Sequence, residues 1–265
     1  ADPTTLELLG MVIAEAPTVP ILHVLTYRPA FTPPWPPQSH LTPIVLGRLE
    51  RAQVEALIAL RAKHKALPPE VVRHIADKTD GVPLYVEELT RMLLSSALLR
   101  EEADRYVLVG PLDSAAIPDT LQDALMARLD RLPQVRELAQ LCSVLGREFA
   151  YELISGISII GDTLLQEGLG RLVEAELFYQ RGRPPRAKYS FKHALIQDAA
   201  YGSLLRRTRQ QVHLQVAQLL EARFPETVET HPELGAHHYS EANVPDLAIN
   251  YFQKAGARAL RMSAN

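Results

Sequence analysis

Two short segments of the sequence place polar side chains where proteins commonly bind ligands. An almost continuous apolar run over residues 19–26 ends in Thr26-Tyr-Arg28, and ligands of open α/β sheets bind at the carboxyl ends of such strands. Lys192 and His193 stand at the start of a helical pattern, where free backbone N–H groups and the helix dipole attract anions. The first segment is a candidate ligand site, and the second is suited to a phosphate.

The other polar clusters are typical of structural roles. Asp2 precedes a proline at a helix start, as an N-cap does. Glu87 and Glu88 fit the solvated face of a helix better than a catalytic acid–base pair. His237 and His238 are adjacent on a predicted helix, and we interpret them as packing or surface residues because no third ligand stands nearby. We expect no catalytic residue and no metal site.

A nucleotide-phosphate loop of the form Gly-x-x-x-x-Gly-Lys-[Ser/Thr] is absent from the sequence. Such a loop supplies backbone N–H groups and a lysine to the phosphates. The chain has six lysines, none of which follows a glycine: Lys63, Lys65, Lys78, Lys188, Lys192 and Lys254. We therefore expect this chain by itself to hydrolyse no nucleotide.

The composition is that of a globular protein of two or more domains. The chain has 265 residues, 47% of them hydrophobic, and a net charge of −3 that leaves no overall basic surface for nucleic acid. Its single cysteine, Cys142, excludes an internal disulfide and a cysteine zinc site. No apolar run has the length of a membrane span. Because the sequence opens Ala-Asp-Pro without Met, we expect a piece of a larger cytoplasmic protein.

Residues 1–43 predict an α/β fragment. Leu6, Leu9 and Ile13 form the apolar stripe of a first helix. The run 19–26 predicts a parallel strand that is buried on both faces. The proline-rich segment 29–37 excludes helix and central strand and indicates an ordered loop, in which Trp35 is either packed or exposed as a contact.

Residues 44–115 predict a helical lid. One helix is expected through about residue 62, a second after Pro68-Pro69 and a third over 85–99, with a break over 79–83 and an extended segment at 105–109.

Residues 116–200 predict a winged helix. Helices are expected over 120–132, 135–145, 151–157 and 164–175, followed by strands at 177–181 and 187–191 that form the wing. The wing is basic, with Arg181, Arg183, Arg186 and Lys188. The helix that would read DNA (about 163–175) instead carries Glu167, Glu174 and Glu176 around its one arginine, Arg171, a charge that disfavours phosphate contact.

Residues 201–265 predict the start of an array of tetratricopeptide-like (TPR-like) helices. Small and aromatic residues alternate at the spacing that paired helices need: Ala236, Tyr239, Ala248, Phe252 and Ala255. One such repeat cannot bury its own face, so further repeats are expected beyond residue 265.

The order of these elements resembles the C-terminal part of a STAND-type P-loop ATPase. These regulatory ATPases occur in bacterial transcription regulators and beside class III nucleotide cyclase domains, and the ATPase region of adenylate cyclase-like proteins is the nearest match. The resemblance covers essentially the whole chain. It rests on Ala1-Asp2-Pro after a Walker B strand, Leu25-Thr-Tyr-Arg28 as sensor 1, Gly81-Val-Pro83 as the Gly-x-Pro motif, and Phe191-Lys-His193 after the wing.

The resemblance implies a switch driven by ATP and ADP with Mg²⁺ in the intact protein. Arg28 would sense the γ-phosphate beside Thr26, Pro83 would pack on the adenine after Gly81, and His193 would bind the ADP β-phosphate. The Walker motifs would lie upstream. The TPR-like helices would receive a protein partner or inducer.

Two other functions fit the same elements. The chain could be a protein-binding scaffold that has lost its ATPase half, or a winged-helix transcription regulator that binds DNA. The resemblance implies that the winged helix clamps the nucleotide, and we expect neither a nucleic-acid partner nor a membrane partner. The fold class expected is mainly α and multi-domain.

Overall fold

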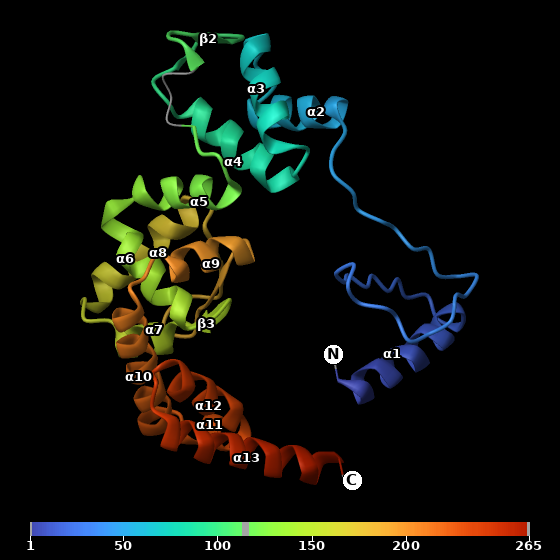
Figure 1. The fold of residues 1–265 in the computed structure, drawn as a ribbon, viewed down its shortest axis with the longest axis vertical. Helices are drawn as coiled ribbons and strands as arrows, with labels where there is room; N and C mark the ends of the chain where they lie inside the picture. The colour runs from blue at the N-terminus through green and yellow to red at the C-terminus, as the bar shows by residue number, and fades with distance from the viewer. Residues whose placement is uncertain (1, 113–116, 264–265) are drawn as a thin grey trace. The chain divides into compact units, whose positions relative to one another are not determined.

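A computed structural model describes residues 2–112 and 117–263 (Figure 1). Within these ranges there are thirteen α-helices, and five short strands form two antiparallel sheets. The mainly helical fold class is confirmed. The chain divides into two compact units, residues 1–47 and 48–265. The boundary predicted between residues 115 and 116 lies outside the described residues.

The first unit contains one α-helix, α1 (Pro3–Glu15), and a short 3₁₀ helix (Ala16–Thr18) in its described part. The Asp2 carboxylate accepts a hydrogen bond from the Thr5 backbone N–H at 2.9 Å, which confirms the predicted N-cap. Ile13 is buried, and its carbonyl accepts a hydrogen bond from the His40 ring at 2.8 Å. The first helix of the sequence analysis is therefore present and is held to the loop that follows.

The strand predicted over residues 19–26 is not formed. The segment pairs with no described strand, and its apolar side chains are open to solvent, with Leu22 87% and Val24 74% exposed. A buried parallel strand requires neighbouring strands for its hydrogen bonds and covering helices for its two faces. The described part of this unit supplies one helix, α1, but no partner strand, so the α/β layer expected here is not formed within residues 2–47.

The proline-rich loop is ordered by its aromatic side chains. The rings of Tyr27 and Phe31 meet edge to face with centroids 5.3 Å apart, and Trp35 lies 6.3 Å beyond Phe31. Trp35 is half-buried by this contact. Of the two alternatives for Trp35, the structure shows the packed one.

The second unit begins with a helical group, α2 (Arg51–Arg61), α3 (Pro69–Thr79) and α4 (Pro83–Leu94), and a hairpin of β1 (Leu99–Glu101) and β2 (Tyr106–Leu108). Its helices and the extended segment match the prediction, except that the third helix ends at Leu94 rather than at residue 99. The hydroxyls of Ser95 and Ser96 bond to the carbonyls of Met92 and Leu93, which competes with further helix. This group has its own core, formed by Val54, Ile58, Val71, Ile75, Tyr85, Val86, Leu89, Leu93, Leu99 and Ala124.

The next group combines helices with a three-stranded sheet. Its helices are α5 (Leu121–Asp130), α6 (Pro133–Val144), α7 (Tyr151–Ile157) and α8 (Asp162–Glu174), and its strands are β3 (Glu148–Ala150), β4 (Phe178–Arg181) and β5 (Lys188–Phe191). The strand order is β3-β5-β4, all antiparallel. The predicted helices and hairpin are present, whereas β3 was missed because three residues carry no readable alternation.

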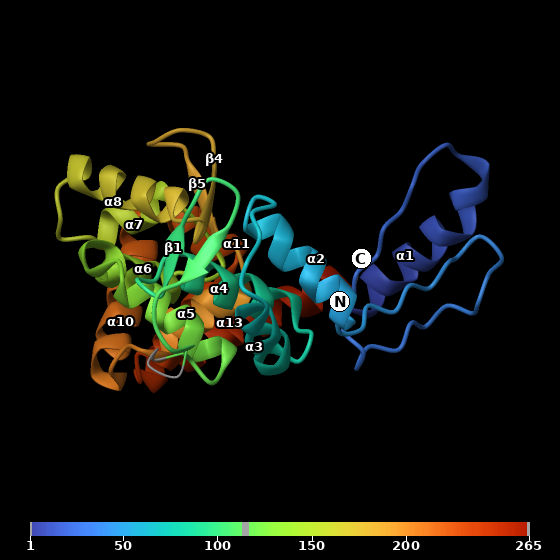
Figure 2. The same cartoon turned by 90° about the horizontal axis from the view of Figure 1, so that it is seen from above.

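Aromatic side chains hold this sheet against the helices. Phe149 of β3, Phe178 of β4 and Phe191 of β5 are buried, and the rings of Phe178 and Phe191 meet edge to face with centroids 4.5 Å apart. The loop that joins β4 to β5 projects at one end of the sheet (Figure 2) and is tied to the start of α7 by a hydrogen bond from the Tyr151 N–H to the Ala187 carbonyl. Its basic side chains are exposed: Arg181, Arg183, Arg186 and Lys188.

The chain continues in α9 (Ala194–Gly202), α10 (Arg206–Arg223), α11 (Pro225–Thr230), α12 (Pro232–Glu241) and α13 (Pro245–Ser263). Of the predicted repeat positions, Ala236, Tyr239 and Ala248 are buried, but Phe252 is 53% exposed. Tyr251 takes the inner position instead and stacks on Tyr239 at 5.6 Å. One-residue offsets of this kind arise because two neighbouring aromatics compete for one helix face.

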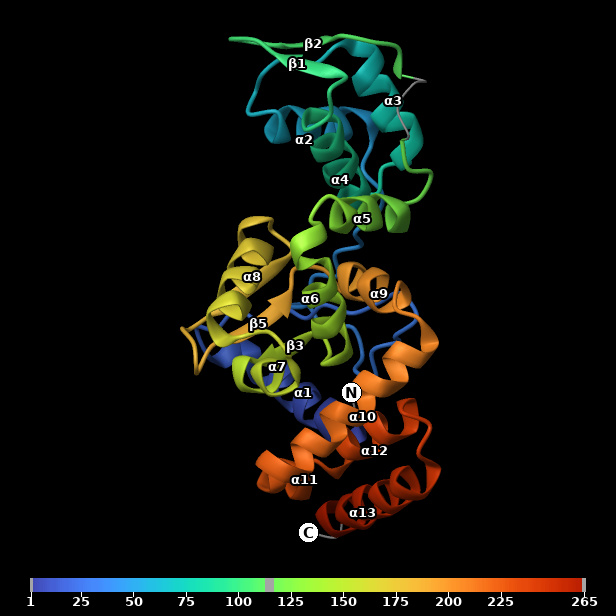
Figure 3. The ribbon, with the colours of Figure 1, turned by 90° about the vertical axis from the view of Figure 1, so that its left-hand side faces the viewer.

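In the second unit α5 lies between α4 and α6 (Figure 3) and contacts both. It contributes Ala124 to the first core and Leu125 and Leu129 to the second. The group of α2, α3 and α4 and the helix–sheet group therefore meet along α5. Over the described part of the chain, no helix combines the length and the apolar character needed to cross a bilayer.

Candidate functional site

Thr26 and Arg28 belong to the first unit and are exposed. Because the strand over 19–26 is not formed, no sheet edge positions them. The chemical role predicted for these two side chains therefore has no local framework within the described residues 2–47, and it remains a prediction.

Gly81 and Pro83 occupy the turn between α3 and α4. Gly81 has φ +68° and follows Asp80, which is also left-handed at φ +47°. The Gly81 carbonyl accepts a hydrogen bond from the Leu49 N–H at 2.8 Å, and a Cβ on Gly81 would lie 2.3 Å from the Leu49 carbonyl oxygen. The turn thus requires glycine for a close backbone approach. Pro83 opens α4 with an exposed ring.

His193 is the residue immediately before α9 and has extended backbone, as expected for a helix start. Burial lowers the pKa of its half-buried ring, and the positive charge of Lys192 lowers it further. Glu87 and Glu88 of α4 act in the opposite direction. His193 therefore lies within electrostatic range of the helix that Pro83 opens.

A buried ion pair joins α4 to α5 beside this histidine. The Glu88 carboxylate and the Arg128 guanidinium are 2.5 Å apart, with side chains only 4% and 12% exposed. Arg128 also donates to the carbonyl of Ala175. Burial lowers the pKa of Arg128, and the attraction of Glu88 opposes this. The prediction that Glu87 and Glu88 form a solvated face is wrong for Glu88, because Arg128 compensates its charge inside the protein.

A second set of ion pairs surrounds Glu176, which lies between α8 and β4 with φ +54°. Its carboxylate pairs with Arg91 of α4 and lies 3.7 Å from the Lys192 ammonium. Burial raises the pKa of Glu176, but Arg91 and Lys192 outweigh it, so that the pKa falls below its ordinary value. On the same helix, Glu87 pairs with Arg61 at 2.6 Å.

We call this set of charged residues the charged joint: Arg61, Glu87, Glu88, Arg91, Arg128, Glu176 and Lys192. An open hollow of about 350 Å³ adjoins it, lined by Arg61, Arg91, Leu94, Ser95 and Glu176. With four cationic and three anionic members, the joint adds ion pairs to the apolar contacts that α5 makes with both groups. Its members are charged side chains paired with one another, and such groups form strong charge-assisted contacts with ions.

The sequence analysis missed Arg128 and Glu176 as members of a site. Arg128 stands between the buried positions Leu125 and Leu129, so its place on a half-buried face was readable. Its partner was not, because Glu88 is 40 residues away. Long-range ion pairs of this kind leave no periodic signal.

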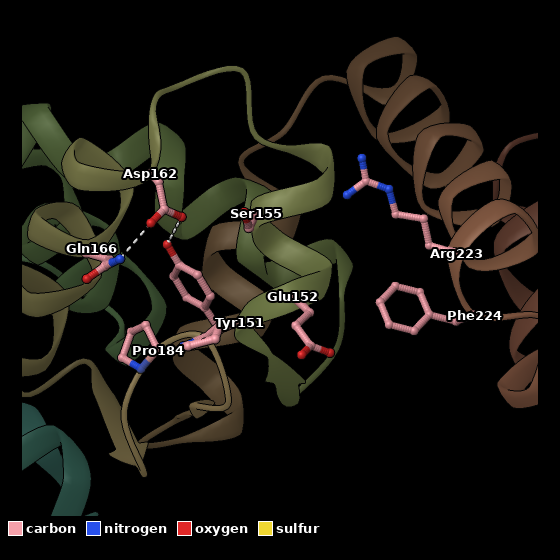
Figure 4. Close-up of a pocket in the computed structure, with 9 residues that line it drawn as sticks. Tyr151, Glu152, Ser155, Asp162, Gln166, Pro184, Arg223 and Phe224 are labelled. Carbon is pink, nitrogen blue, oxygen red and sulfur yellow. Dashed lines mark hydrogen bonds between the residues drawn. The ribbon is translucent and has the colours of Figure 1, made fainter.

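A larger hollow, about 560 Å³, lies between α7, α8, the β4–β5 loop and the end of α10 (Figure 4). Asp162 accepts hydrogen bonds there from the Tyr151 hydroxyl and, at 2.7 Å, from the Gln166 amide. Burial, followed by the bond to Asp162, raises the pKa of Tyr151 to about 12. Both carboxylate oxygens of Asp162 are engaged, so this group fastens α8 to α7 and presents no free acid.

A third cluster contradicts one premise of the sequence analysis. His213 of α10 lies against His237 and His238 of α12, with ring centroids 5.6 Å and 5.0 Å away. The expectation that these two histidines lack a third ligand is therefore wrong. Folding supplies it from a position 24 residues earlier than His237, which local sequence spacing does not reveal.

Comparison with known proteins identifies one similar chain. Uncharacterized protein R02095 of Rhizobium meliloti (strain 1021) is 26% identical over 268 residues, covering 99% of this chain and 25% of that protein. The chain thus spans about a quarter of the length of this relative. No protein-family model matches the sequence.

Proposed function

We propose that this chain is part of a regulatory STAND-type ATPase that switches between ATP-bound and ADP-bound arrangements. The observation that carries the proposal is the charged joint. Its buried Glu88–Arg128 pair fastens α4, which Pro83 opens, to α5 of the helix–sheet group, which His193 follows. A nucleotide phosphate brought to such a joint competes for its cations. Ligand charge is then converted into a change of domain arrangement.

The connectivity of the second group supports its assignment as a winged helix. A strand (β3) follows the helix α6, two further helices come next, and a β4–β5 hairpin closes a three-stranded sheet. In the proposed switch this module acts as an internal clamp on the nucleotide. The exposed charge of α8, with Glu167 and Glu174 at the surface, does not favour the DNA-binding alternative.

The scaffold alternative has one observation in its favour. Apolar side chains of α13 are exposed at a level unusual for a finished helix pair: Leu247 42%, Ile249 55%, Phe252 53% and Leu260 74%. In our proposal, a further TPR-like helix or a protein partner covers this face in the intact protein. The scaffold and the switch differ in whether nucleotide is bound.

The first test uses the 265-residue chain. We expect it neither to hydrolyse ATP nor to bind it tightly, because it contains no phosphate loop. Isothermal titration and phosphate release measure both properties. Turnover above that of a heat-denatured control would show that the upstream core assumed by the proposal is unnecessary.

The second test uses the intact parent protein and the variant His193→Ala. If His193 donates to the ADP β-phosphate, losing this charge-assisted contact of about 1.5–3 kcal/mol lowers ADP affinity about 10- to 100-fold. The matched control is His231→Ala, an exposed histidine paired with Glu233 at 3.0 Å. ADP dissociation is measured for all three proteins, with circular dichroism as the fold control. A folded variant with unchanged ADP affinity would restrict His193 to the start of α9, and a parent that binds no nucleotide would favour the scaffold.

A further inference from the structure

Three histidines of the TPR-like helices form a compact cluster. A ring nitrogen of each of His213, His237 and His238 lies within 4.8 Å of the others. The Nδ1 atoms of His213 and His238 are 2.8 Å apart and share a hydrogen bond. His213 and His238 are 1% and 5% exposed, whereas His237 is at the surface. The cluster therefore has a buried floor and an opening to solvent.

Hydrogen bonds behind the cluster fix the tautomer of His213. The Tyr201 hydroxyl donates its one proton to the Glu241 carboxylate at 3.1 Å. Its oxygen lies 3.0 Å from Nε2 of His213, and with its proton already donated it accepts there. Nε2 thus carries the hydrogen, and the lone pair of Nδ1 points into the cluster. Metal-binding histidines are oriented by a chain of this type, in which the second ring nitrogen donates outward.

We propose that His213, His237 and His238 bind one Zn²⁺ ion. Three imidazoles with no thiolate or carboxylate suit a borderline divalent ion such as Zn²⁺ and disfavour Ca²⁺ and Mg²⁺, which prefer oxygen ligands. Two ligand nitrogens of a tetrahedral zinc are about 3.3 Å apart, given Zn–N distances of about 2.0 Å. The 2.8 Å between the two Nδ1 atoms reaches that value when the rings separate slightly.

The ion takes the place of the hydrogen that now lies between the two Nδ1 atoms. When His238 moves its hydrogen from Nδ1 to Nε2, both Nδ1 lone pairs face the ion and both rings remain neutral. Burial lowers the pKa of His213 to about 4 and that of His238 to about 3. The exposed His237 completes three ligands and leaves the fourth position to water.

The test is titration of the untagged 265-residue chain with zinc chloride. We expect one ion per chain with a Kd below about 10 μM, since that concentration corresponds to a binding energy typical of a modest protein site. Replacing Zn²⁺ by Co²⁺ should give the visible absorption of a four-coordinate ion. The ion ties α10 to α12, so saturating Zn²⁺ should also raise the Tm by about 5 °C.

Three variants make the test specific. His237→Ala removes an exposed ligand without disturbing the core, and should weaken Zn²⁺ binding at least about tenfold, as even outer partners do. Tyr201→Phe removes the acceptor behind His213 and should weaken it about tenfold. His23→Ala, an exposed histidine of the first unit, should have no effect. Absence of saturable binding up to about 100 μM, a level far weaker than protein zinc sites, would overturn the proposal, as would equal affinity in His237→Ala.

Discussion

Residues 19–26 and 187–191 are both short segments that predict strands, the first as a nearly continuous apolar run and the second by alternation, and only the second forms a strand. Tyr189 and Phe191 are 2% and 1% exposed and pair with strands on both sides. Leu22 and Val24 are largely open to solvent. The two segments differ in their pattern and also in the partners that surround them. The second run has β3 and β4 within the same unit, whereas the described part of the first unit provides no partner strand.

This comparison shows that an apolar run is buried only where other strands and helices are present to cover it. A strand gains stability from its neighbours through ladder hydrogen bonds and cross-strand packing. Where those neighbours lie in the same stretch of chain, the sequence predicts the strand correctly. Where they do not, as at 19–26, an apolar run stays exposed, which is typical of an interaction surface.

The largest effect should follow from Phe191→Ala in the paired run. The variant removes a ring packed against Phe149 and Phe178, and its free energy of unfolding should fall by about 3–5 kcal/mol. Urea unfolding followed by circular dichroism measures the change. A loss below about 1 kcal/mol, the cost of small rearrangements, would mean that this sheet is not the core of its group.

An intermediate effect is expected at the charged joint from Arg128→Met. Removing one partner of a buried pair leaves Glu88 uncompensated, which costs about 3 kcal/mol. The double variant Arg128→Met with Glu88→Gln should recover part of this stability, because residue 88 then carries no unpaired buried charge. The control Arg131→Met, at the exposed end of the same helix, should be close to neutral. Equal losses of stability in Arg128→Met and Arg131→Met would exclude a special role for the buried pair.

The smallest effect should follow from Leu22→Ser in the unpaired run. Because this side chain is already 87% exposed, its replacement should change the unfolding of the second unit by less than about 0.5 kcal/mol. Chemical denaturation with the signal taken from the second unit's helices is the measurement. A large loss of stability would show that the run is buried in solution, and it would sharpen the comparison in favour of the original strand prediction.

Much of the second unit was readable from the sequence because its signals are local. Prolines at helix starts, Gly146 after α6 with φ +108°, and the period change at β4 marked most elements correctly. Ser95 and Ser96 end α4 before β1, which the helix expected over 85–99 did not allow for. Two further errors have other causes. Tyr251 and Phe252 compete for one helix face, and β3 is too short to show a pattern.

The candidate sites were less readable because they depend on contacts between distant segments. Arg128 and Glu88 lie 40 residues apart, and His213 and His238 lie 25 apart. The roles of Arg28, Pro83 and His193 came from motif resemblance and stay predictions.

The hydrogen bond between Leu49 and Gly81 has a mechanical consequence. It clamps the chain where it enters the second unit directly to the turn that begins α4. A pull on the segment before residue 49 is therefore delivered to the first turn of α4 and, through Glu87 and Glu88, to the joint beyond. Through this bond the segment before residue 49 is connected to α4 directly, whereas the covalent chain reaches α4 only after α2 and α3. Inserting glycines before residue 49 should reduce any force transmitted to α4. Replacing Gly81 should disrupt the backbone contact with Leu49 that transmits it.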